Sequence, residues 1–197
     1  MPTMPTTHLL YLHGFRSSPQ STKARLVADY VRQHHPQVVW LCPQLPASPA
    51  AAMQAVLQAV AHWPSAQMAV IGSSLGGYYA SYVAQHKRCK SALLNPSVAP
   101  DQTLASYVGQ QPLWHAPEQA IFFRPEYIDE LRTLDVRDQP PAGPELGIFC
   151  TGDEVLNWRD MVQRYPHAQQ HIIEGSDHAI SGFEQHLPVL MGFLELA

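Results

Sequence analysis

The sequence predicts an α/β protein built around a parallel sheet, and three observations support that prediction. Short apolar runs alternate with longer stretches of helical periodicity, which is the pattern of strand–helix–strand units. The length of 197 residues fits one domain, since domains commonly span about 100–200 residues. Hydrophobic residues make up 46% and charged residues 14% of the chain, a composition that excludes a disordered chain. We therefore expect a single domain over residues 1–197.

Six apolar runs are predicted to form the strands of this sheet. Each run is short and rich in Val, Ile and Leu, as expected for strands that are buried on both faces. The predicted strands span residues 8–12, 37–41, 68–72, 91–94, 146–151 and 169–173. Because helical stretches separate most of these runs, neighbouring strands are expected to be parallel, with helices on both faces of the sheet.

The first two predicted helices have clear sequence signals at their ends. Residues 21–35 carry apolar side chains at a spacing of three and four, and Pro36 ends this helix. Ser48 is a candidate N-cap because its hydroxyl can accept a hydrogen bond from the first turn. Pro49 then occupies the first helical position, where proline is favoured, and the helix is expected to continue to about His62.

The later part of the chain is less regular. A helix over residues 75–86 follows the third strand directly, and a last helix is expected over 181–196. Pro188 must either kink this last helix or mark its true start. Between them, residues 96–144 contain no convincing strand but several aromatic residues among prolines. We interpret 96–144 as a cap-like excursion of short helices over one end of the sheet, since a long connection in a compact domain usually has a function.

The strongest functional motif is the pentapeptide Gly72-Ser73-Ser74-Leu75-Gly76. It has the G-x-S-x-G pattern and lies between a predicted strand and a predicted helix, which is the context of a nucleophile elbow. Glycines two residues before and two after the serine remove side chains that would collide where the helix crosses the strand. Ser74 is therefore the candidate nucleophile, and Ser73 is not.

A second motif, Tyr11-Leu12-His13-Gly14-Phe15, ends the first predicted strand. An oxyanion hole in such a protein uses the N–H of the residue after the nucleophile and one N–H from an earlier strand–loop junction. Leu75 and Phe15 are the residues at these two positions. We expect His13 to shape this loop rather than to act as the base, which should come from a late loop.

The candidate acid and base follow the fifth and sixth predicted strands. A serine needs a base to remove its proton, and a histidine base needs a carboxylate that fixes its tautomer. Asp153 and His178 fill these roles, and the order Ser74, Asp153, His178 is that of α/β-hydrolases. All three side chains follow strands, at the sheet end where open α/β sheets bind ligands. Three other carboxylates remain open as alternatives for the acid, namely Asp101, Glu154 and Asp177.

The sequence resembles the YqiA-type small bacterial esterases over nearly its whole length. The resemblance is carried by the loop after the first strand, by the string from Gly72 to Ala80, by Asn95-Pro96, by the string from Thr151 to Leu156, and by His178-Ala179. It implies a compact α/β-hydrolase fold that lacks the usual first antiparallel hairpin, with six strands in the order 2-1-3-4-5-6. It also implies hydrolysis of carboxylic esters and supports the three residues already chosen.

We therefore expect a serine esterase that acts on a small-molecule ester through an acyl-enzyme. An acyl-thioester hydrolase with the same three residues and a non-catalytic binding module are the alternatives. No cofactor or metal is expected, because the histidines lack metal-site spacing. The net charge of −4 gives no indication of nucleic-acid binding. No oligomeric state is predicted.

The expected location is the cytoplasm. The first seven residues lack the basic residue and apolar run of a signal peptide, and no apolar run approaches the length of a membrane span. The three cysteines, Cys42, Cys89 and Cys150, are odd in number and not closely spaced, as expected of free thiols in a reducing compartment.

Overall fold

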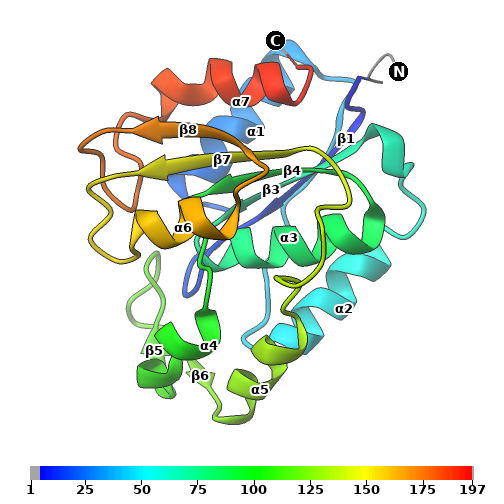
Figure 1. The fold of residues 1–197 in the computed structure, drawn as a ribbon. Coiled ribbons are helices and arrows are strands. Elements are labelled where there is room, and N and C mark those ends of the chain that lie inside the picture. The colour runs from blue at the N-terminus through cyan, green and yellow to red at the C-terminus, as the bar shows by residue number, and fades with distance from the viewer. Residues whose placement is uncertain (1–4, 197) are drawn as a thin grey trace.

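The computed structural model describes residues 5–196, so residues 1–4 and 197 of the predicted domain lie outside it. A six-stranded sheet forms its centre, with all neighbouring strands parallel (Figure 1). The strand order is β2-β1-β3-β4-β7-β8. Since β7 and β8 are the fifth and sixth strands of this sheet, the order confirms the predicted 2-1-3-4-5-6. The strands are β1 (His8–Leu12), β2 (Val39–Leu41), β3 (Met68–Ser73), β4 (Lys90–Leu94), β7 (Glu145–Cys150) and β8 (Gln169–Ile173).

Helices cover both faces of the sheet, as predicted (Figure 1). On one face lie α1 (Thr22–His34) and α7 (Leu187–Phe193). On the other lie α2 (Pro49–Ala59), α3 (Leu75–Lys87) and α6 (Trp158–Arg164). Within residues 5–196, no helix has the length and apolar character needed to cross a membrane.

The core is divided by the sheet into two apolar layers. Alternate residues of a strand point to opposite faces, so β1 contributes Leu9 and Tyr11 to the layer under α1 and α7. Leu10 and Leu12 of the same strand enter the layer under α2 and α3. All four side chains are fully buried. This two-sided burial explains why central strands such as β1 and β3 are nearly continuous apolar runs rather than alternating ones.

The helix ends follow the sequence signals closely. The Ser48 hydroxyl accepts a hydrogen bond from the Ala51 N–H at 3.1 Å, so it caps α2 as expected. This helix ends at Ala59, a few residues before the predicted end. The last helix is the shorter of the two alternatives, because α7 begins at Leu187 with Pro188 in its first turn. A 3₁₀ turn, Phe183–His186, precedes it.

The expectation that 96–144 contains no strand is wrong. β5 (Gly109–Pro112) and β6 (Ala120–Phe123) form an antiparallel pair separate from the main sheet (Figure 1). They escape sequence analysis because each has only four residues and β5 is polar and ends in proline. The expected short helices are present as α4 (Pro100–Thr103) and α5 (Glu126–Thr133).

Aromatic packing joins this excursion to the carboxyl end of β1. The Phe15 ring lies 5.2 Å from the Phe123 ring and 5.9 Å from the Tyr107 ring, both with edge-to-face geometry. Phe123 is buried, so this aromatic residue belongs to the core of the excursion. The contact places residues 96–144 beside the loop that carries the predicted oxyanion donor.

Candidate active site

Ser74 occupies a strained turn between β3 and α3. Its φ of 56° and ψ of −122° lie in a region that side chains other than glycine rarely adopt. The Ser74 N–H donates to the Leu94 carbonyl of β4 at 3.0 Å, and the Ser74 carbonyl accepts from the N–H of Ser97 at 3.0 Å. The strain is therefore maintained by hydrogen bonds to the neighbouring strand and the loop that follows it.

Glycines allow α3 to cross β1 and β3 at very short range. A Cβ atom at Gly72 would lie 2.0 Å from the carbonyl oxygen of Gly76. A Cβ atom at Gly76 would lie 2.0 Å from the carbonyl oxygen of Leu12 in β1. Real Cβ atoms do not approach backbone this closely, so both glycines of the G-x-S-x-G motif are sterically required.

This close approach predicts a large difference between two Gly→Ala substitutions. Gly76→Ala is expected to lower the free energy of unfolding by at least about 1–3 kcal/mol, because the added methyl group overpacks rigid backbone. Gly192 in α7 has open space around its Cβ position. Gly192→Ala should therefore raise the free energy of unfolding by up to about 1 kcal/mol, because alanine has the higher helix propensity. Urea unfolding measures both, and equal midpoints for the two variants would contradict the steric argument.

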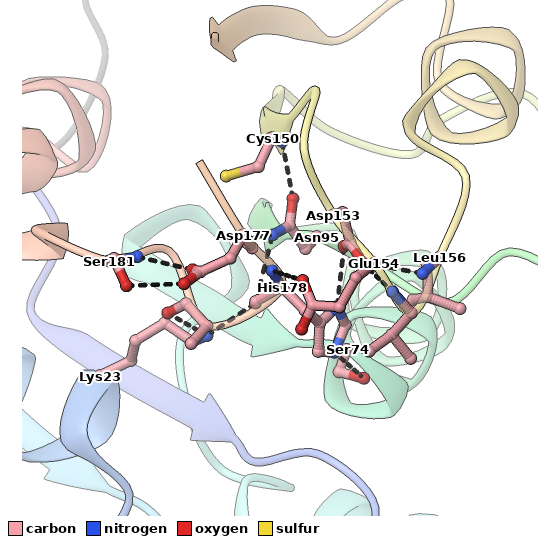
Figure 2. A network of polar contacts seen from close by, with 12 residues as sticks. Lys23, Ser74, Asn95, Cys150, Asp153, Glu154, Leu156, Asp177, His178 and Ser181 are labelled. Atoms are coloured by element: carbon pink, nitrogen blue, oxygen red, sulfur yellow. Dashed lines mark hydrogen bonds and ion pairs between the residues drawn. The ribbon is translucent and has the colours of Figure 1, made fainter. Parts of the chain in front are cut away.

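The structure brings Ser74, Asp153 and His178 together (Figure 2). Nε2 of His178 lies 3.0 Å from Oγ of Ser74, and Nδ1 lies 2.7 Å from Oδ2 of Asp153. Nδ1 faces a carboxylate and therefore carries the proton of a neutral imidazole, which leaves Nε2 free to accept one from the serine. The Asp153 side chain is fully buried, whereas that of His178 is 21% exposed and reaches the surface of the site.

The Asp153 carboxylate is itself held by its own loop. Its Oδ1 accepts hydrogen bonds from the N–H groups of Val155 and Leu156, each at 2.8 Å. Oδ2 is thereby left for the imidazole. A carboxylate fixed in this way can orient the histidine ring and stabilise its protonated form.

Two of the alternative acids bind other groups. Asp101 lies on α4, 3.3 Å from the guanidinium of Arg132. Asp177 accepts hydrogen bonds from the N–H and the hydroxyl of Ser181, and these bonds lower the pKa of Asp177. Among the described residues, Asp153 is the carboxylate that contacts the imidazole of His178.

Three further side chains bind the backbone of His178 (Figure 2). Glu154, the third alternative acid, accepts the His178 N–H at 3.0 Å rather than contacting the ring. The His178 carbonyl accepts from Nδ2 of Asn95 at 3.2 Å and from Nζ of Lys23 at 3.4 Å. Sequence analysis assigned no role to Lys23, because nothing in its local sequence indicates a partner 155 residues away. Asn95 directly follows a predicted strand, and this position at a strand end is the sequence signal that could have indicated a role for Asn95.

The predicted oxyanion donors lie on the expected loops. Leu75 is the first residue of α3, so its N–H has no partner within the helix. Phe15 follows Gly14, where a Cβ atom would lie 3.2 Å from the Cβ of Ser74. The loop after β1 thus packs directly against Ser74, and both Phe15 and Leu75 border the same cavity.

His13 has a structural role in this loop, as expected. Its Nδ1 lies 3.0 Å from the Gly14 carbonyl and its Nε2 accepts the Leu45 N–H at 3.1 Å. This pairing requires a neutral ring that is protonated at Nδ1. Burial lowers the pKa of His13 below its ordinary value of 6.5. A ring held in this way anchors the loop to the Leu45 segment and is not available as a general base.

The lowered pKa values of two histidines, the buried His13 and the partly buried His186, predict that the protein is less stable in mild acid. Burial also lowers the pKa of His186, whose Nδ1 lies 3.1 Å from Nε2 of His171. The unfolded chain therefore binds more protons than the folded one below the ordinary histidine pKa of about 6.5. The free energy of unfolding should be highest above that pH and should fall as the pH decreases through it. Urea midpoints at about pH 7.5 and about pH 5.5 measure this change, and His186→Gln should reduce it; equal midpoints would contradict the prediction.

A cavity of about 670 Å³ opens over Ser74 and His178. Its lining includes the apolar side chains of Leu104 and Trp114 and the aromatic ring of Tyr107. Residues of the β1–α1 loop and of the start of α1, including Lys23, also line the cavity. Such a cavity has room for a small molecule that carries both apolar and polar groups. Within residues 5–196, no group of three or more His, Cys, Asp or Glu side chains is arranged to hold a metal ion.

Comparison with solved structures identifies the fold. Est1E from Butyrivibrio proteoclasticus is 15% identical, with a TM-score of 0.70, over 96% of this chain and 86% of Est1E. Alpha/beta hydrolase domain-containing protein 10 from mouse is also 15% identical, with a TM-score of 0.70, over 96% of this chain and 91% of that protein. The Pyrococcus furiosus esterase Pf2001 is 15% identical, with a TM-score of 0.63, over 98% of this chain and 82% of that protein. The chain therefore has the α/β-hydrolase fold that the sequence predicted.

Comparison with protein families gives one match over nearly the whole chain. The model of an uncharacterised protein family, UPF0227, matches residues 8–195. This range includes every strand of the main sheet and the three residues that meet at the site.

Proposed function

The chain belongs to the protein family UPF0227, and we propose that it is a serine hydrolase that cleaves carboxylic esters through Ser74, Asp153 and His178. The match to this family confirms the resemblance to YqiA-type proteins indicated by the sequence motifs. Several matched structures carry the name esterase, among them the esterase domain from Rhodothermus marinus and Pf2001. Those names support the proposed reaction class, and the activity itself is inferred from the site.

The observation that carries the proposal is the position of His178 between Ser74 Oγ and Asp153 Oδ2. In the proposed mechanism, Nε2 of His178 takes the proton of Ser74 as its oxygen attacks the ester carbonyl. The N–H groups of Phe15 and Leu75 stabilise the oxyanion, each contributing roughly 3–4 kcal/mol to the transition state. His178 then protonates the leaving alcohol. Water then attacks the acyl-enzyme in the same way, which releases the carboxylic acid and restores Ser74.

The alternatives differ in what they require of the site. A binding module does not need a series of hydrogen bonds that runs from Ser74 Oγ through His178 to the buried Asp153. The presence of these hydrogen bonds therefore favours an enzyme. An acyl-thioester hydrolase needs the same chain of contacts, and no specific contact favours it over an esterase. A small-molecule ester remains the proposed partner. A cytoplasmic location fits the three cysteines, which are free thiols.

A substrate panel tests the proposal. The wild-type protein is incubated with 4-nitrophenyl esters and with acyl-thioesters of increasing acyl length. We expect turnover of the aryl esters and stoichiometric labelling by a fluorophosphonate probe. Hydrolysis of thioesters alone would favour the alternative activity. Absence of both turnover and labelling in folded protein would contradict a serine hydrolase.

A further inference from the structure

We infer that Lys23 is a positioning residue that holds His178 in register with Ser74, an inference that rests on the proposed function. Lys23 lies in the first turn of α1, on the opposite face of the sheet from α3. Its ammonium donates to the carbonyl of Ala179 at 2.8 Å and contacts the carbonyl of His178 at 3.4 Å. Figure 2 shows the lysine reaching this loop from the side away from Ser74.

Lys23 is one of three side chains that hold the backbone of His178, together with Glu154 and Asn95 (Figure 2). Glu154 accepts the N–H of His178, while Asn95 donates to the carbonyls of Asp177 and His178 at 3.1 and 3.2 Å. Asn95 is itself buried, and its Oδ1 accepts the Cys150 N–H of β7 at 2.8 Å. The peptide groups on both sides of His178 are therefore held by side chains from three separate elements.

These backbone hydrogen bonds matter because the position of the His178 backbone determines the position of its imidazole ring. Two hydrogen bonds, to Ser74 Oγ and to Asp153 Oδ2, depend on one ring position. A displacement of about 1 Å at a reacting group can lower the rate about 100-fold. Lys23 is suited to prevent this displacement because an ammonium group has three donors, and hydrogen bonds from a charged donor are the stronger ones.

The environment of Lys23 makes its contribution depend on pH. Burial lowers the pKa of Lys23 to about 8, and the facing groups Cys150, Asp177 and Asp153 act in the opposite direction. The charged ammonium is therefore present below about pH 8 and is lost as the pH rises through that value. A neutral amine donates more weakly to the two carbonyls. We expect turnover to decline on the alkaline side through this ionisation.

The test compares Lys23→Met with a matched control, Lys87→Met. Lys87 also donates to two backbone carbonyls, those of Ala61 and Trp63 at 3.0 and 3.2 Å, but lies at the end of α3, away from the site. Lys23→Met should lower kcat on a 4-nitrophenyl ester about 10–100-fold and leave KM within about threefold. Lys87→Met should leave both unchanged. An equal loss in the two variants, or no loss in Lys23→Met, would overturn the inference.

A second variant separates the charge from the fold. Lys23→Arg keeps a cation that does not deprotonate in this pH range, so it should restore at least part of kcat and remove the alkaline decline. A decline that is identical in wild type and Lys23→Arg would overturn the role of the ammonium.

A readout without turnover separates this inference from the proposed function. The Nδ1 proton of His178, bound to Asp153, should give a low-field resonance in the proton NMR spectrum of the wild type. Lys23→Met should broaden or shift this resonance, whereas Lys87→Met should not. If the wild type neither turns over esters nor reacts with the fluorophosphonate, the proposed function fails, and this resonance still decides whether Lys23 positions His178.

Discussion

Ser74→Ala is expected to abolish ester turnover, with a loss of about three to six orders of magnitude in kcat. The substitution removes the only oxygen placed 3.0 Å from Nε2 of His178 within the described chain, so no acyl-enzyme can form. Stoichiometric labelling by a fluorophosphonate should disappear with it. Stopped assays at high enzyme concentration and mass spectrometry of the labelled protein measure the two effects.

Ser73→Ala is the matched control for this substitution. Ser73 is the neighbouring residue at the end of β3 and is buried, so its replacement tests the local fold without touching the proposed nucleophile. It should retain labelling at Ser74 and at least part of the turnover. Labelling that survives Ser74→Ala, or disappears only in Ser73→Ala, would show that the wrong serine has been assigned.

The sheet was predictable because its strands are separate apolar runs. The apolar residues at the start of β3 (Met68–Ser73) form such a run and lead directly into the G-x-S-x-G motif. The position of the site followed from the parallel arrangement, because Phe15, Ser74 and Asp153 all come shortly after strands. Parallel strands bring such loops to one edge of the sheet.

Other features could not be predicted because they depend on tertiary contacts. β5 is a four-residue strand that pairs only with β6 in this structure, so it has no periodicity to detect. The helix α6 has only seven residues and is marked mainly by its Asn157 cap. Lys23 reaches its partners through an arrangement of α1 and the His178 loop that no local pattern encodes.

The choice of Asp153 over its neighbours illustrates the same limit. Sequence order places Asp153 and Glu154 side by side, and either carboxylate could follow the strand end. The structure distinguishes them by direction, since Asp153 contacts the imidazole and Glu154 contacts the backbone N–H of His178. Consecutive side chains point in different directions. A difference of one position along the chain therefore decides whether a carboxylate contacts the imidazole or the backbone of His178.

Asp153→Asn is expected to lower turnover by about four orders of magnitude, by analogy with the acid of serine proteases. The amide keeps the shape of the side chain, and its Oδ1 can still accept from Val155 and Leu156. An amide group directed at Nδ1 of His178 then favours the tautomer protonated at Nε2, which cannot accept the serine proton. The imidazolium formed during catalysis also loses the buried carboxylate that stabilises it.

The decisive measurement compares Asp153→Asn with the same change at the three alternative acids. Asp101→Asn should have little effect, because Asp101 pairs with Arg132 on the surface. Asp177→Asn and Glu154→Gln disturb the His178 loop but leave the ring contact with Asp153 intact, so both should cost far less than four orders of magnitude. Turnover of one activated ester by all four variants, with folding confirmed by circular dichroism, ranks them. If Glu154→Gln or Asp101→Asn is the inactive variant while Asp153→Asn turns over normally, then Ser74 and His178 act with a different acid from the one at 2.7 Å.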